Sequence, residues 1–164
     1  MFNVGDMVIY SIHGVSRIDD ICEKTISNVT KTYYVLHPLD QTNLIISAPV
    51  DSDKVVMQKL LDSNEAKEIL LSFQQPEADW IDNPKQRYRQ YQDIIRTGNR
   101  REIAKIARTL MRKDMELHLE HKKLYEQDRK ILDPIQHLLF KELAMSLDTT
   151  FEKIVEKVNR LLKQ

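Results

Sequence analysis

Glycine and cysteine are scarce in this sequence: its 164 residues include three glycines and one cysteine, Cys22. So few glycines exclude the glycine-rich phosphate loops of dinucleotide-binding and Walker-type proteins. A single cysteine excludes an internal disulfide and a cysteine-based zinc site, which fits a reducing compartment. Long apolar runs and an N-terminal signal pattern are also missing, although 41% of the residues are hydrophobic. We therefore expect a cytoplasmic protein with a packed core and no membrane contact.

The net charge of zero hides an uneven distribution of charge along the chain. Residues 1–79 have six Lys and Arg against twelve Asp and Glu, a net charge of −6, and the remainder has nineteen against thirteen, a net charge of +6. Between Lys85 and Lys113, ten basic residues face only Asp93 and Glu102. Charged runs are usually solvated surface, but an excess of this size favours contact with the phosphates of a polyanion.

The first sixty residues have the pattern of short strands. Apolar, β-branched and aromatic residues gather at 7–10, 15–26, 33–36, 44–46 and 55–57, with turn-forming residues between them. Five short strands with tight connections bury their apolar faces by curling into a small barrel. We therefore expect a Tudor-like or SH3-like β-barrel over residues 1–58. The run Leu44-Ile45-Ile46 near its edge offers backbone groups to a partner, and this acidic domain is expected to bind protein.

Residues 59–164 change to the 3.6-residue period of helices, which predicts an all-helical second domain and an α+β protein. Helix starts are indicated by Asp62 with Glu65, Asn83 before Pro84, Asn99 with Glu102, and Thr149 with Glu152. Another helix is expected over residues 128–147, in which Pro134 should cause a kink or a break. The segment 74–83 is expected to be linker-like.

Trp80 is the only tryptophan and lies in that segment. A single tryptophan between helices is more often a plug in the core than a ligand contact. Lys85, Arg87 and Arg89 follow within ten residues, however, and an apolar ring flanked by cations is what a minor-groove wedge requires. The pattern alone leaves both interpretations open.

The basic stretch continues into the next predicted helix with its apolar residues on the opposite face. Its cations are Arg96, Arg100, Arg101, Lys105, Arg108, Arg112 and Lys113. Zinc-finger and leucine-zipper motifs are absent, so we expect contacts with the DNA backbone and its shape, without base readout.

Candidates for catalysis or metal binding are weak. His118 and His121 lack the HEXXH spacing, and Cys22 has no neighbouring base. Asp19 and Asp20 are adjacent in a predicted strand and so point to opposite faces. We expect neither an enzyme nor a protein with a metal or another cofactor.

Several motifs, in order along the chain, resemble one bacterial family. They are VGDMVIY at 4–10, HG at 13–14, YYVL at 33–36, APV at 48–50, DW at 79–80, RYR at 87–89, TGN at 97–99, RTL at 108–110 and KELA at 141–144. Together they resemble the CarD/CdnL transcription regulators, whose N-terminal domain also occurs in the transcription-repair coupling factor. The chain has no room for the helicase motifs of the coupling factor.

The resemblance implies that the N-terminal domain binds the β subunit of bacterial RNA polymerase and that the helical domain lies on promoter DNA upstream of the −10 element. Trp80 matches the family's tryptophan, which wedges into the minor groove at the edge of the bubble and slows its collapse. Arg89 matches a basic position that contacts DNA. A monomer associated with the nucleoid through polymerase is then expected.

These arguments together give two sets of candidate residues. The DNA-binding candidates are Trp80, Lys85, Arg87, Arg89, Arg100, Arg101, Lys105 and Arg108, and the polymerase-binding candidates are Lys24, Ile26, Leu44, Ile46 and Ser47. Ser47 stands where well-known members have arginine, and Lys24 keeps a cation at another matching position. The alternative is an adaptor, or a specialised paralogue, that binds no DNA and links polymerase to another protein.

Overall fold

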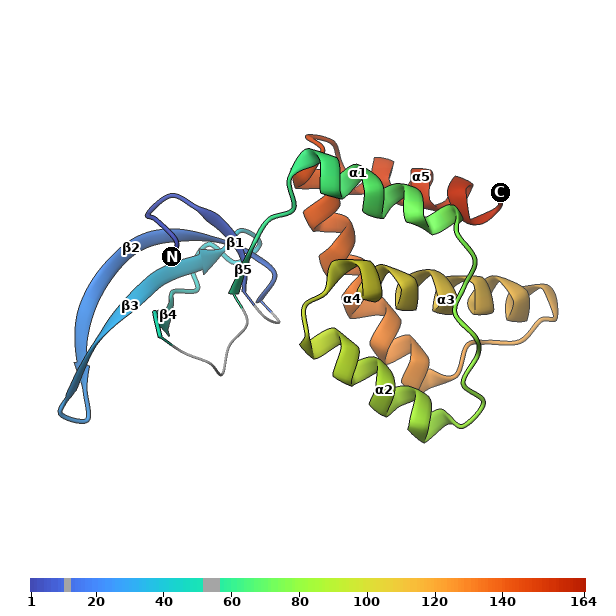
Figure 1. Cartoon of the computed structure of the whole chain (residues 1–164), viewed down its shortest axis with the longest axis horizontal. Coiled ribbons are helices and arrows are strands. Elements are labelled where there is room, and N and C mark those ends of the chain that lie inside the picture. The colour runs from blue at the N-terminus through green and yellow to red at the C-terminus, as the bar shows by residue number, and fades with distance from the viewer. Residues whose placement is uncertain (11–12, 52–56) are drawn as a thin grey trace. The chain divides into compact units, whose positions relative to one another are not determined.

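The computed structural model describes residues 1–10, 13–51 and 57–164 and divides the chain into two compact units, Met1–Leu60 and Leu61–Gln164 (Figure 1). The first unit is an antiparallel sheet and the second is helical, so the expected α+β class is confirmed. Within the described ranges, no helix is both long enough and apolar enough to cross a membrane.

The sheet of the first unit has five strands in the order β4-β3-β2-β1-β5, and all neighbours are antiparallel. The strands are β1 (Met7–Tyr10), β2 (Val15–Ile26), β3 (Val29–Pro38), β4 (Ile46–Pro49) and β5 (Met57–Lys59). Val8, Ile18 and Leu36 are completely buried in the core of this sheet. The sheet therefore has the alternating apolar face that the sequence predicts.

One of the strand predictions needs correction, and another falls partly outside the described residues. The fourth strand begins only at Ile46, so Leu44 and Ile45 precede it instead of belonging to it. For the fifth strand, Val55 and Val56 lie outside the described residues, and β5 starts at Met57.

A long hairpin formed by β2 and β3 is the feature of this unit that sequence analysis missed. Its turn contains Ser27 and Asn28, whose φ angles are 52° and 64°, and two positive φ angles are the requirement of a type I′ turn. Beside the turn, Ile26 and Val29 remain 54% and 51% exposed. Figure 1 shows this hairpin curving away from the shorter strands, so its tip adds no apolar core.

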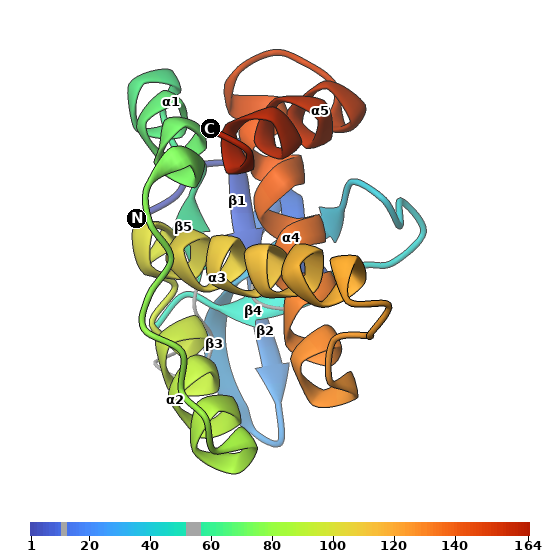
Figure 2. The same ribbon diagram turned by 90° about the vertical axis from the view of Figure 1, so that its right-hand side faces the viewer.

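The second unit contains five α-helices and one short 3₁₀ turn. They are α1 (Ser63–Leu71), η2 (Ser72–Gln74), α2 (Pro84–Arg96), α3 (Arg100–Leu119), α4 (Glu126–Ser146) and α5 (Phe151–Leu162). Helix α4 contacts the other four helices and crosses α3 (Figure 2). Phe73, Leu110, Phe140 and Leu143 are fully buried in the shared core, which makes α4 the central helix of the unit.

Three of the four predicted helix starts are confirmed by their capping hydrogen bonds. The side chains of Asp62, Asn83 and Asn99 accept hydrogen bonds from the backbone N–H groups of Glu65, Gln86 and Glu102, at 2.8, 3.0 and 3.2 Å. The fourth start is wrong by one residue, because Thr150, and not Thr149, accepts from the N–H of Lys153 at 3.2 Å.

The sequence predicts a kink or a break at Pro134, and the break does not occur. Helix α4 continues through this residue for 21 residues. Pro134 is exposed, so water can hydrate the carbonyl group that loses its donor. The proline therefore costs one hydrogen bond without ending the helix.

Candidate nucleic-acid interface

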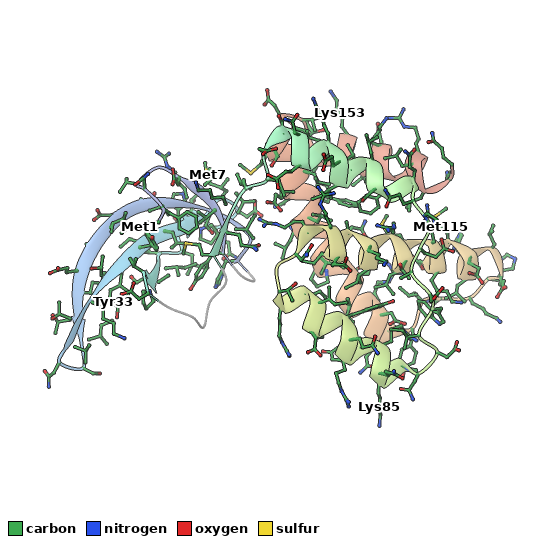
Figure 3. The ribbon with its side chains drawn as sticks, viewed as in Figure 1. Met1, Met7, Tyr33, Lys85, Met115 and Lys153 are labelled. Atoms are coloured by element: carbon green, nitrogen blue, oxygen red, sulfur yellow. The ribbon has the colours of Figure 1, made fainter. Side chains whose placement is uncertain are left out.

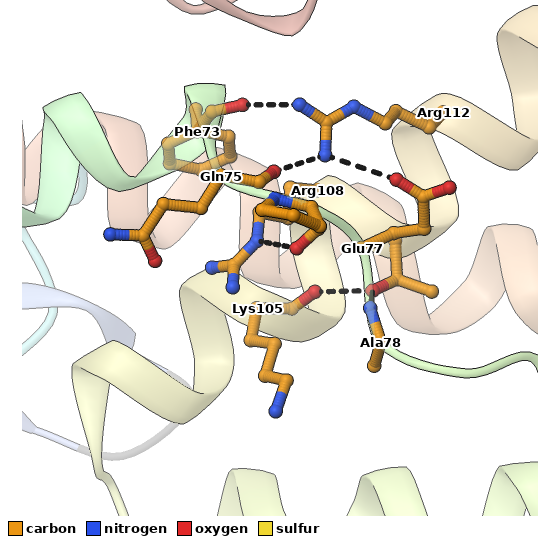
Figure 4. A network of polar contacts seen from close by, with 9 residues as sticks. Phe73, Gln75, Glu77, Ala78, Lys105, Arg108 and Arg112 are labelled. Carbon is orange, nitrogen blue, oxygen red and sulfur yellow. Dashed lines mark hydrogen bonds and ion pairs between the residues drawn. The ribbon is translucent and has the colours of Figure 1, made fainter.

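Three side chains of α3 hold the segment that carries Trp80, residues 75–83, together with the 3₁₀ turn before it (Figure 4). They are those of Arg108, Thr109 and Arg112. Arg112 donates through Nη2 to the carbonyl of Phe73 at 2.9 Å and through Nη1 to the carbonyl of Gln75. Arg108 donates through Nε to the carbonyl of Pro76 at 2.9 Å. We call residues 75–83 the Trp80 segment.

Thr109 provides a further attachment. Its hydroxyl oxygen accepts from the N–H of Ala78 at 3.0 Å and donates to the carbonyl of Lys105 at 2.7 Å. Because these bonds tie the Trp80 segment to α3, the segment lies within the helical unit. The segment 74–83, which the sequence predicts to be linker-like, joins η2 to α2 and contains no helix over residues 75–83.

Trp80 itself is partly buried and packs against the helical core. The guanidinium carbon of Arg87 lies 4.3 Å from the centroid of its ring, and the ammonium nitrogen of Lys113 lies 4.9 Å from it. Both distances are within the range of a cation–π interaction. The indole is therefore neither sealed in the core nor free, and two cations from α2 and α3 hold it.

Arg87 is a buried structural residue, with 3% of its surface exposed. It pairs with Asp128 through two hydrogen bonds, Nε to Oδ1 at 2.8 Å and Nη2 to Oδ2 at 2.6 Å, and its Nη1 donates to the carbonyl of Ile81 at 2.6 Å. Asp128 lies in the first turn of α4, where the helix dipole favours a carboxylate. The prediction that Arg87 presents its charge to DNA is corrected by this burial.

Two more of the predicted DNA contacts have their charges turned inward. Arg100 pairs with the buried Glu142 at 2.9 Å, and Glu142 also accepts from the N–H of Leu61 at 3.0 Å. Arg108 is 6% exposed. Both residues support the packing of the helical unit, so the picture of α3 as a helix with a wholly outward cationic face is wrong.

The remaining candidates differ in exposure and in their partners. Lys85 and Arg89 are exposed in α2, and their side chains form no hydrogen bond or ion pair with any described residue. Figure 3 shows Lys85 projecting from the helical unit. Arg101 is exposed but pairs with Glu68. Lys105 is partly buried. Of the predicted DNA contacts, Lys85 and Arg89 are therefore the exposed cations whose charges have no partner among the described residues.

The candidates for polymerase binding lie on two parts of the first unit. Lys24 of β2 donates through Nζ to the hydroxyl of Ser47 in β4 at 2.6 Å. Ile46 packs against the core, and β4 is an edge strand of the sheet. Ile26 is exposed at the hairpin tip, and Leu44 is 36% exposed ahead of β4.

Sequence analysis missed the roles of two residues, Asp128 as the partner of Arg87 and Lys113 as a neighbour of the indole. Asp128 is 41 positions from Arg87, and no local spacing connects them. Within the described ranges, no group of three His, Cys, Asp or Glu residues could hold a metal ion.

Comparison with known proteins covers both units. Residues 2–61 match the family described as "CarD-like/TRCF RID domain", and residues 64–159 match "CarD, C-terminal domain". A relative from Bacillus subtilis (strain 168), described as "Putative transcription factor YdeB", is 31% identical over 157 residues, which cover 94% of this chain and 97% of the relative. The order of the two matched domains is that of the sheet and helical units. The chain therefore belongs to the CarD family, and its role is connected with transcription.

Proposed function

We propose that this protein binds the β subunit of bacterial RNA polymerase through its sheet unit and stabilises the open promoter complex through its helical unit. The contact with DNA is made by Trp80, Lys85 and Arg89, without base-specific readout. Arg87 and Arg108 are excluded from that surface because they are buried. The protein has no catalytic role in this proposal.

The proposal rests on one observation, which is that the Trp80 ring and the chain that carries it are held in place by neighbouring side chains. Two cations lie over its ring, at 4.3 and 4.9 Å, and the chain that carries it is bonded to α3 on the N-terminal side and to Arg87 at Ile81. A wedge that enters a base step must not swing away under the force of the closing duplex. A ring held on a segment bonded to α3, with the unpaired cations Lys85 and Arg89 in the helix that follows, meets that requirement.

For the polymerase, we propose the edge formed by β4 together with Lys24. An edge strand offers unpaired backbone groups to a partner strand. Lys24 places its ammonium group beside Ser47, and so brings a positive charge to the position where other family members have arginine.

An adaptor that binds no DNA is the alternative, and one observation favours it. Arg87, Arg100, Arg101 and Arg112 all form ion pairs within the helical unit, so the attraction of the basic stretch for phosphates is smaller than its sequence predicts. An adaptor requires only that the helical surface binds a second protein.

The lifetime of the open complex separates the two functions. With purified polymerase and a promoter that forms unstable open complexes, the protein should lengthen the half-life, and Trp80→Ala should lose most of that effect. About 1.4 kcal/mol of contact made only with opened DNA changes the occupancy ratio tenfold. Binding of Trp80→Ala to polymerase without DNA should equal that of the wild type. An unchanged half-life with both proteins would support the adaptor.

A further inference from the structure

A pocket of about 530 Å³ lies between α1, η2 and α3. Arg108 forms part of its lining, and Lys105, Arg101, Glu68 and Glu102 are among the other lining residues. The pocket lies within the helical unit. It does not include Trp80 or the exposed cations of α2.

The charge of Arg108 has no carboxylate partner among the described residues. Its one hydrogen bond joins Nε to the neutral carbonyl of Pro76, although the residue is only 6% exposed. Figure 4 shows the two Nη atoms turned away from that carbonyl, between the side chains of Gln75 and Lys105 in this view. Buried charges in proteins are normally paired, so this guanidinium lacks a counter-ion.

The surroundings increase that deficit. Burial, followed by repulsion from Arg112, lowers the pKa of the Arg108 guanidinium, and the more distant carboxylates of Glu102 and Glu77, which form no ion pair with it, only partly oppose this shift. Lys105, which also lines the pocket, is partly buried, and its ammonium group forms no hydrogen bond or ion pair within the described part of the chain.

The acidic residues of the pocket do not cancel both cations. Glu68 is paired with Arg101, which leaves Glu102 alone against Lys105 and Arg108. The side chains of Gln74 and Gln75 also line the pocket, and their amides can donate further hydrogen bonds. An anion with several oxygen atoms would satisfy the two Nη atoms, the ammonium group and an amide at the same time.

We propose that this pocket binds a small phosphate-type anion, such as the diphosphate group of a nucleotide. The planar guanidinium offers two parallel donors to a phosphate, which is the geometry that arginine binds best. A diphosphate carries more than one negative charge and so outweighs the repulsion of Glu102. Because Arg108 is only 6% exposed, a compact ligand reaches its guanidinium more readily than the backbone of a stiff duplex.

Titration of the full chain with sodium pyrophosphate tests this proposal. Thermal unfolding is followed at constant ionic strength, with sodium chloride as the reference salt. The protein should gain a saturable rise in melting temperature with pyrophosphate, because a ligand that binds only the folded state stabilises it. The NMR signal of the Arg108 Nε–H group should shift over the same concentration range.

Three variants identify the site. Lys105→Gln should weaken pyrophosphate binding about tenfold, as expected for the loss of one charge-assisted hydrogen bond. Lys157→Gln removes an exposed lysine of α5 that is not among the pocket-lining residues and has no ion pair with a described residue, and should change the affinity less than twofold. Glu102→Gln should strengthen binding, because it removes the unpaired carboxylate. The unliganded melting temperatures of the variants show that each is folded.

Several results would overturn the proposal. One is a lack of saturable binding, and another is an equal loss of affinity in Lys157→Gln and Lys105→Gln, which would indicate diffuse attraction only. A third is competition between pyrophosphate and a short DNA duplex, with Lys105→Gln weakening the binding of both, because the pocket would then hold a DNA phosphate. These titrations contain no polymerase, so the outcome is independent of the effect of Trp80 on open complexes.

Discussion

Arg87 and Asp128 form a buried pair in which two guanidinium nitrogens meet both carboxylate oxygens, at 2.8 and 2.6 Å. The side chains of the two residues are only 4% and 2% exposed. The same guanidinium lies against Trp80. The pair thus connects the start of α4 with the residue that we propose to act on DNA.

Replacement of Asp128 by Ala should destabilise the helical unit by about 3–5 kcal/mol, because Arg87 would remain as an uncompensated buried charge. Urea unfolding followed by circular dichroism and by Trp80 fluorescence measures this loss. Asp93→Ala is the matched control, since its pair with Arg96 is exposed and should contribute less than about 1 kcal/mol. The double variant Arg87→Met with Asp128→Leu should recover part of the lost stability. An unaltered unfolding midpoint in Asp128→Ala would contradict the pairing.

Lys85 and Arg89 should account for most of the salt dependence of DNA binding. Changing both to Gln should weaken binding and lower the slope of log K against log salt concentration by about 0.9 for each lost phosphate contact. Arg96→Gln, at the other end of α2, removes a cation that pairs with Asp93 and should leave the slope nearly unchanged. Fluorescence anisotropy with a labelled promoter fragment at several salt concentrations makes the measurement. Equal slopes in all three proteins would remove α2 from the DNA surface.

Tyr91 should tolerate loss of its hydroxyl group. The hydroxyl is buried and has no partner among the described residues, so Tyr91→Phe removes an unsatisfied polar group and should be neutral or stabilising at pH 7. Burial raises the pKa of Tyr91 above its ordinary value of 10.0.

That shift of the pKa also predicts behaviour at alkaline pH. A raised pKa in the folded state means that the hydroxyl ionises first in the unfolded chain. The wild type therefore loses stability as the pH rises above about 10, by at most about 1.4 kcal/mol per pH unit. Tyr91→Phe should therefore lose less stability than the wild type between pH 9 and 11 in urea unfolding. A parallel decline in both proteins would show that the hydroxyl is solvated.

Lys24 should matter more than Ser47 for binding to polymerase. Lys24→Ala removes the cation and should weaken the complex about tenfold, whereas Ser47→Ala removes only the acceptor of its hydrogen bond and should weaken it two- to threefold. Arg17→Ala removes an exposed cation elsewhere on β2 and serves as the control. Affinity for purified polymerase is measured without DNA. Wild-type affinity in Lys24→Ala would exclude this edge as the contact.

Sequence analysis predicted the elements whose signals are local. The caps at Asp62, Asn83 and Asn99 act over three residues, so the sequence contains both partners of each hydrogen bond. At the last helix, Thr149 and Thr150 are both suitable N-cap residues by sequence. The path of the chain before the helix places Thr150 at the N-cap position. The turn at Ser27 was missed because serine is an unusual residue at a positive φ angle.

Whether each arginine side chain faces solvent or bonds to an internal partner could not be predicted from the sequence. The spacing of Arg87, Arg100 and Arg108 is equally suitable for phosphate contacts and for internal pairing. Their partners are Asp128, Glu142 and the carbonyl of Pro76, all more than 30 positions away. Such partners become neighbours only through the crossing of α3 and α4 and the course of the Trp80 segment. Composition thus gives the number of positive charges, and tertiary structure decides how many face outward.

The attachment of the Trp80 segment by guanidinium groups has a consequence for the range of conditions in which the protein works. Guanidinium groups stay protonated in proteins at any physiological acidity, and most of their acceptors here are peptide carbonyls, which do not titrate. A segment fastened by histidine would loosen when the cell becomes acidic or alkaline. The indole of this protein should instead keep one orientation through such changes, so it should not respond to intracellular pH.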